Sequence, residues 1–163
     1  MKSVLINGLV AFGNVNVSMQ PPDKIAVGEN EEGQLNLFLY RVAPHTRLLG
    51  NNRSAGSPIR LALELHYLLT AYSARDFQTE ILLGRAIQLF HESPVLTADD
   101  LRRAADQVPP NHPKRVVKPG PGQLEEVRIT PQFLSFEDMA RLWSALQARY
   151  RPSVAYQAAV VIV

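Results

Sequence analysis

The stretch Leu134–Val163, LSFEDMARLWSALQARYRPSVAYQAAVVIV, decides the fold of this chain. Its first half predicts an amphipathic helix with Ser135 as the N-cap and Asp138 at the third helical position. Pro152 cannot continue a helix and restricts the residue before it to extended geometry, so the apolar run Ser153–Val163 is predicted to be a strand. The stretch therefore predicts a helix packed on the sheet that its own strand enters, and it carries no catalytic group.

The predicted helix has one apolar face. Leu134 and Met139 occupy the two positions of a hydrophobic staple, which fixes how the chain enters the helix. Apolar residues at helical spacing are typical of a core face, and this explains the pattern better than a ligand site does. The face consists of Met139, Leu142, Trp143, Leu146 and Tyr150, of which we expect Trp143 and Tyr150 to anchor the core.

Three further strands are predicted upstream. Leu35–Val42 is apolar on both faces, as in an inner strand, and Pro44 ends it. Ile59–Tyr72 alternates strictly between an apolar and a polar face, and at about 3.3 Å per residue it would exceed about 40 Å, so we expect it to bend or to project as a β-arm. Leu124–Thr130 is shorter and is ended by Pro131. The polar face of Ile59–Tyr72 holds Arg60, Glu64, His66 and Thr70, and the inward side chains of Leu124–Thr130 are Val127 and Ile129.

Helices are predicted between these strands. Asp76 is placed to cap a helix over Phe77–His91, and Thr97 begins a capping box for a short helix through Ala105. The first segment leaves two alternatives open, because Asn7-Gly8 is typical of a hairpin, but a helix ending near Gly13 is preferred. The buried stripe of the longest of these helices is Leu82, Leu83, Ala86, Leu89 and Phe90, and that of the first is Val4, Leu5, Leu9 and Val10.

Four loops separate the elements: Gln20–Asp23, the acidic turn Gly28–Gly33, His45–Pro58 and Gln107–Gln123. The last holds five prolines and two glycines, a density that no sheet interior tolerates, so it is predicted to be an exposed basic loop. The whole chain, residues 1–163, is predicted to be a single α+β domain with a mixed, mostly antiparallel sheet and helices packed on it.

Composition excludes several classes of function. The chain has no cysteine, which excludes disulfides and thiolate metal sites, and a net charge of +2 is too small to require a nucleic-acid partner. No apolar run reaches the roughly 18 residues that a membrane span needs, and the first segment is broken at Asn7-Gly8, unlike a signal peptide. No membrane partner is predicted.

The sequence contains no recognisable catalytic or metal-binding motif. The four histidines lack the spacing of metal ligands, and Gly120-Pro121-Gly122 lacks both the Lys-Ser/Thr and the backbone N–H groups of a phosphate loop. The paired acids have no catalytic partner, and no G-x-S-x-G elbow is present. We therefore predict no enzyme, no catalytic or metal-binding residue and no cofactor. Basic loop residues that can meet a neighbouring subunit are the predicted interface: Lys114, Arg115, Lys118, Arg47 and Arg53.

Four blocks of sequence carry a family resemblance. They are LNLFLYRV, PIRLALELHYLLTAYS, ILLGRAIQLFHESPVL and ITPQFLSFEDMARLWSALQARYRPSVAYQA, with Tyr67–Tyr72, Leu142–Leu146 and Tyr150–Ser153 as the most specific parts. Their order and spacing resemble the N-terminal-type domain of cap, or tail-terminator, proteins of extracellular contractile injection systems. These are phage-tail-like particles of the antifeeding-prophage kind. The resemblance runs from about Leu35 to the end of the chain.

The resemblance implies a structural protein that forms a homo-oligomeric ring of six copies. Such a ring would end tube growth, attach the last sheath layer, and have the sheath and inner tube proteins as partners. Assembly would take place in the bacterial cytoplasm, and the finished particle can be released. Relatives usually carry more helix before a segment like Ser3–Phe12, so an internal or truncated start at Met1 and a missing extension after Val163 are expected. The alternatives are a baseplate or tube-initiating component, and a small-ligand or peptide-binding α+β module.

Overall fold

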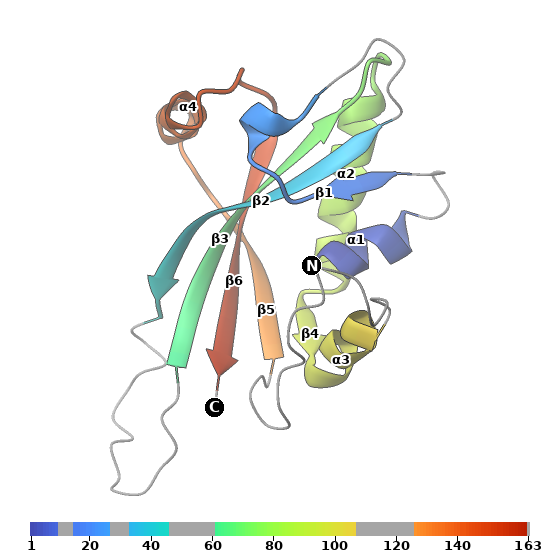
Figure 1. Ribbon diagram of the computed structural model, residues 1–163, viewed down its shortest axis with the longest axis vertical. Coiled ribbons are helices and arrows are strands. Elements are labelled where there is room, and N and C mark those ends of the chain that lie inside the picture. Colours follow the sequence, from blue (N-terminus) through green and yellow to red (C-terminus); the bar gives the residue numbers. More distant parts are fainter. Residues whose placement is uncertain (10–14, 27–32, 46–60, 107–125, 163) are drawn as a thin grey trace, which may run out of the picture.

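The computed structural model describes residues 1–9, 15–26, 33–45, 61–106 and 126–162. Within these ranges the chain forms a six-stranded sheet in the order β1-β2-β3-β6-β5-β4, with four α-helices around it (Figure 1). The pair β1–β2 is parallel, and the other four pairs are antiparallel. The predicted α+β class with a mixed, mostly antiparallel sheet is confirmed.

The elements follow the predicted order, with three short ones added. The strands are β1 Asn16–Ser18, β2 Gln34–Pro44, β3 Leu61–Tyr72, β4 Val95–Thr97, β5 Glu126–Gln132 and β6 Ser153–Ile162. The helices are α1 Lys2–Gly8, α2 Gln78–Glu92, α3 Ala98–Asp106 and α4 Phe136–Ala145, together with the 3₁₀ helix η2 Pro22–Lys24. The three-residue elements β1, β4 and η2 were not predicted, because so short a segment shows no periodicity.

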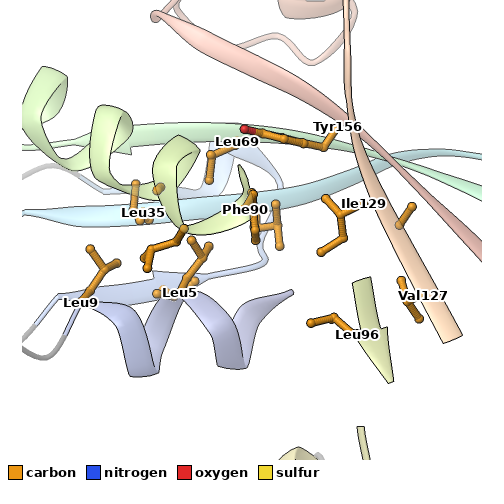
Figure 2. Close-up of a cluster of buried hydrophobic side chains, with 14 of the residues drawn as sticks. Leu5, Leu9, Leu35, Leu69, Phe90, Leu96, Val127, Ile129 and Tyr156 are labelled. Atoms are coloured by element: carbon orange, nitrogen blue, oxygen red, sulfur yellow. The ribbon is translucent and has the colours of Figure 1, made fainter. Parts of the chain in front are cut away.

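The main core lies between one face of the sheet and helices α1 and α2 (Figure 2). Leu69 of β3 lies opposite Leu37 of β2 and Val154 of β6, so the apolar face of the long strand continues across its neighbours. Phe90 of α2 packs edge-on against Tyr156 with the ring centroids 4.9 Å apart. The predicted apolar face of β3 and the predicted stripe of α2 both contribute to this core.

Helix α4 covers part of the opposite face. Trp143 and Met139 pack on Leu68, which points away from the main core because side chains alternate along β3. Ser135 caps the helix as predicted, since its Oγ accepts the backbone N–H of Asp138 at 3.1 Å. As predicted, α4 therefore packs on the sheet that the following strand, β6, enters.

The C-terminal end of α4 corrects one prediction. The helix ends at Ala145, and Gln147 adopts a left-handed backbone with φ 52°. The chain turns there before the helical stripe reaches Tyr150, so Tyr150 is 49% exposed instead of anchoring the core. Trp143, at 2% exposure, is the core anchor that was predicted.

Two helix boundaries also differ from prediction. Helix α1 ends at Gly8 and not near Gly13, and a Cβ on Gly8 would lie 2.3 Å from Leu89 Cδ2 of α2. This glycine therefore allows a close approach of the two helices. Asp76 does not cap α2. The N-cap is Phe77, which has a left-handed backbone with φ 60° and no side-chain capping bond.

Strand pairing explains the remaining differences. Strand β1 pairs with only the first three residues of β2, Gln34–Asn36, so the rest of β2 is an edge strand within the described part of the chain. Pro131 does not end β5, which continues to Gln132, because β4 pairs only with Glu126–Arg128 and leaves Pro131 on an open edge where proline is tolerated. Strand β3 is paired with β2 and β6 and does not project as a free arm.

Candidate assembly surfaces

The interface residues predicted from the sequence lie outside the described ranges. This holds for Arg47 and Arg53, and for Lys114, Arg115 and Lys118 of the predicted basic loop. Of the predicted loops Gly28–Gly33 and His45–Pro58, the structure describes only the ends, Gly33 and His45. Gly33 is buried, and a Cβ there would lie 2.4 Å from Leu82 Cδ1, so this end of the acidic turn is part of the core.

An exposed aromatic patch is formed by Phe136, the first residue of α4, and Tyr150, and Phe133 is exposed just before the helix. Phe133 is 93% exposed and Phe136 is 76% exposed. The rings of Phe136 and Tyr150 are 5.8 Å apart, and that of Tyr150 is 6.2 Å from Trp143. Exposed, clustered aromatic side chains are typical of protein–protein contact sites. The sequence contained no signal for this patch, because Phe136 lies three residues before Met139 and seven before Trp143, a spacing typical of the core face.

The free edge of β2 is a second candidate surface. Beyond Asn36 this strand has β3 on one side and, within the described residues, no strand on the other. A bulge between Leu39 and Arg41 interrupts the register with β3, and Leu39 and Val42 are exposed on the way to Pro44. An unpaired edge can accept a strand from another chain, although bulges and a terminal proline restrict which strand can pair.

A polar network occupies the sheet face that α4 leaves open. His45 donates from Nδ1 to Glu64 Oε1, and His66 donates from Nδ1 to Gln132 Oε1 at 2.8 Å. The Tyr40 hydroxyl donates to the same Gln132 oxygen at 3.3 Å. The hydrogen bond from His45 holds the pKa of Glu64 below its usual value, against a smaller opposing effect of desolvation. The network ties β2, β3 and β5 together, and it contains no nucleophile.

The predicted polar face of β3 is buried at His66 and Thr70. Both side chains are buried: His66 lies beside the Tyr40 ring and donates to Gln132, and Thr70 donates to Ser153 of the neighbouring strand β6. Glu64 and His66 are two residues apart on one strand, and this spacing predicts that their side chains lie on the same face. The contact of His45 with Glu64 could not be predicted in this way, because it depends on the register between β2 and β3.

A cleft of about 240 Å³ lies between η2, the end of β3 and the segment that follows α4. We call it the arginine cleft, and it is lined by Pro22, Asp23, Ile25, Tyr72, Trp143, Gln147, Ala148, Arg149 and Arg151. The Arg151 guanidinium lies over the Tyr72 ring, 4.8 Å from its centroid. Desolvation raises the pKa of Tyr72, so its hydroxyl stays protonated at neutral pH although Arg151 acts in the opposite direction.

Two residues that line the arginine cleft each carry a fully buried donor that has no hydrogen-bond partner within the described residues. The donors are the Tyr72 hydroxyl and the Trp143 indole N–H, both on side chains that are at least nine-tenths buried. The Asn36 side chain lies close enough to the Tyr72 hydroxyl to oppose the rise of its pKa through a hydrogen bond, and the Asn36 Oδ1 is another buried polar atom without a partner among the described residues. A buried polar group without a partner destabilises a fold by about 1–3 kcal/mol.

A larger cleft of about 350 Å³ lies between α1, β4 and α3. Its charged groups already have partners, because Asp100 accepts from the backbone and hydroxyl of Thr97 and pairs with Arg103 at 2.6 Å. This arrangement is the predicted capping box of α3, and it explains the polar lining as a structural feature.

The described residues offer little chemistry. Among them, no group of three or more histidine, aspartate or glutamate side chains could hold a metal ion. None of the helices in the described ranges has the length and apolar character needed to span a bilayer. The features that remain are surfaces for binding other molecules.

Comparison with known proteins places this fold in one class. The structure matches the sheath/tube terminator of an extracellular contractile injection system, PVC, in its extended state, with a TM-score of 0.60 and 16% identity over 99% of this chain and 54% of that chain. It also matches the tube-terminating cap of the anti-feeding prophage, with a TM-score of 0.62 and 18% identity over 98% of this chain and 52% of that chain. The fold is therefore that of a tail terminator, and the chain spans about half the length of the solved structures that it matches.

The sequence comparison identifies the family. The model of the Pvc16 N-terminal domain matches residues 1–163, so the chain belongs to this family. No curated protein sequence matches the chain. The family resemblance drawn from the sequence is confirmed.

Proposed function

We propose that this chain is part of the structural cap of a contractile injection system, where it ends tube growth and attaches the last sheath layer. The observation that carries the proposal is the fold match to two terminator structures over 98–99% of the chain. Membership of the Pvc16 N-terminal domain family supports the same role. The role is a non-enzymatic one, with the sheath and inner tube proteins as partners and neither nucleic acid nor membrane among them.

The cap is proposed to be a homo-oligomeric ring of six copies. A closed ring uses head-to-tail contacts, so each copy must present two different, complementary surfaces. The aromatic patch and the free edge of β2 are candidates for these surfaces, and strand addition to β2 would supply main-chain hydrogen bonds. Lys114, Arg115, Lys118, Arg47 and Arg53 remain the predicted interface residues of the loops. We further propose that the ring assembles in the bacterial cytoplasm and leaves the cell within the finished particle.

Native mass spectrometry of the purified protein, alone and with the tube and sheath proteins, tests the proposal. We expect a closed oligomer of six copies that also binds tube or sheath subunits. Phe136→Ser should weaken these associations, whereas Ile6→Ser, a matched change of an exposed side chain on α1, should not. A protein that stays monomeric at high concentration and ignores tube and sheath proteins would refute the role.

A further inference from the structure

The outer face of α2 is apolar, although this helix already contributes a second apolar face to the main core. Its core side chains are Leu82, Ala86, Leu89 and Phe90. On the other side of the helix, Ile81 is 57% exposed and Ile87 is 37% exposed. A helix that is apolar all round is normally buried all round. The outer face of α2 therefore has the character of a surface that another molecule covers.

Gly84 lies at the centre of this outer face. At about 100° per residue, it is about 160° from Leu82 and Ala86 of the core face and about 60° from Ile81 and Ile87. Its backbone is outside the left-handed region, and a Cβ there would meet nothing within 4 Å. A glycine inside a helix costs about 1 kcal/mol relative to alanine, and no contact of the described residues accounts for it. The close approach of a second backbone would account for it.

The start of the helix adds a third exposed apolar side chain. Phe77, the N-cap residue, is 77% exposed and has a left-handed backbone with φ 60°. A bulky residue in this conformation is strained by about 1–3 kcal/mol, and such strain is typical of functional positions. Exposed apolar side chains thus extend along α2 from Phe77 to Ile87.

The outer face is complementary to a second copy of itself in the antiparallel orientation. Ile81 and Ile87 lie three residues before and after Gly84, so an antiparallel pair centred on Gly84 places Ile81 of one copy in the same layer as Ile87 of the other. The same arrangement places Glu80 beside Gln88, whose amide can donate to the carboxylate. A parallel pair would instead bring the two Glu80 carboxylates together and align the two helix dipoles, and both effects are unfavourable.

We infer that α2 forms an antiparallel, two-fold contact with α2 of a second copy of this chain, with Gly84 at the crossing point. The two helices can approach closely there because neither copy has a side chain at this position. The contact is isologous, so it is distinct from the head-to-tail contacts of the proposed ring and does not depend on the proposed function. One helix face is a small interface, so the association is weak.

The absence of cysteine from the chain allows a direct test of this arrangement. Glu80→Cys and Gln88→Cys each place a single thiol at an exposed position next to the crossing point. When the two variants are mixed under mild oxidation, we expect a mixed disulfide dimer. It should form about tenfold faster than either variant couples to itself, because only the mixed pair brings two Cα atoms within the roughly 7 Å that a disulfide allows.

Gly84→Leu in both chains fills the crossing point and should slow the mixed coupling to the rate of a control pair, Asp99→Cys with Arg102→Cys on α3. This variant should fold, because its Cβ lies in open space, and thermal unfolding checks that it does. Ser144→Leu, at an exposed position of α4, should leave the coupling unchanged.

Three results would each overturn the inference. They are a mixed coupling no faster than that of the α3 control pair, a Glu80→Cys variant that couples faster to itself, and a mixed coupling that survives Gly84→Leu. The copy number in native mass spectrometry tests the ring separately, so the two proposals fail independently.

Discussion

The two faces of the sheet are built in different ways although the same strands supply both. One face packs Leu35, Leu69 and Tyr156 under α1 and α2 and is closed. The other is covered by α4 over Leu68, and elsewhere carries the polar network around Glu64. Figure 1 shows α4 on the other side of the sheet from α1 and α2. The closed face holds the larger core cluster, whereas the half-open face carries the polar network and lies next to the exposed rings of Phe136 and Tyr150.

The largest expected difference is in the free energy of unfolding of two variants, one at a buried and one at an exposed phenylalanine. Phe90→Ala removes a buried ring from the closed face and should lower the free energy of unfolding by about 3–5 kcal/mol, because a cavity remains. Phe136→Ala removes an exposed ring from the first turn of α4 and should lower the free energy of unfolding by about 1 kcal/mol or less. Urea denaturation of both variants measures the difference. Equal losses would mean that the aromatic patch is part of the core and not a contact surface.

Two glycines test how tightly the closed face is packed. Gly8→Ala would place a methyl group against Leu89 and should destabilise the protein by about 1–3 kcal/mol, because the buried Leu89 side chain would have to move away from it. Gly84→Ala adds a methyl group in open space on α2 and should stabilise it by about 0.5–1 kcal/mol. Thermal unfolding of the two variants should therefore give midpoint shifts of opposite sign. Shifts of the same sign would contradict the close contact of α1 with α2.

The cap of α4 tests the stability of the half-open face. Ser135→Ala removes the acceptor for the Asp138 N–H and should destabilise the protein by about 1 kcal/mol. Ser144→Ala changes an exposed serine of the same helix that caps nothing, and should change the stability by less than about 0.5 kcal/mol. Hydrogen exchange at the first turn of α4 reports the local effect, and unchanged protection there in Ser135→Ala would rule out the capping role.

The polar network gives the smallest expected effect, a change in pH dependence. The pKa of Glu64 is lowered in the folded state, so its contribution is present above the unfolded pKa and is lost as the pH falls through the folded value. Glu64→Gln should therefore flatten the loss of stability on the acid side. His45→Gln should flatten it as well, and the double variant should add little to either, because the two residues form one interaction. Additive effects in unfolding measured as a function of pH would contradict the pairing.

Local features of the sequence predicted much of the fold. The cap and staple of α4, the stripe of α2 and the alternation of β3 each depend on residues a few positions apart, and each is confirmed. The end of α4 was predicted wrongly, because the left-handed turn at Gln147 replaces a helical continuation that the apolar spacing of Tyr150 favoured. The edge position of β2 depends on how short β1 is, which no local pattern reveals.

The candidate surfaces were less predictable than the core. The arginine cleft unites η2, the end of β3 and the segment after α4, which only the packing of α4 on the sheet brings together. The pairing of His45 with Glu64 requires the register of β2 on β3. The aromatic patch lies within the stretch that decides the fold, but exposure could not be inferred for Tyr150, whose spacing matched the core face.

The central claim is that this chain belongs to the structure that terminates the tube. Electron microscopy of particles assembled without the protein that contains this chain tests the claim most directly. Particles from cells supplied with the intact protein are the control. Without the terminator we expect tubes of widely varying length that lack density at the end distal to the baseplate. Particles of uniform length with closed ends, formed in its absence, would contradict the claim.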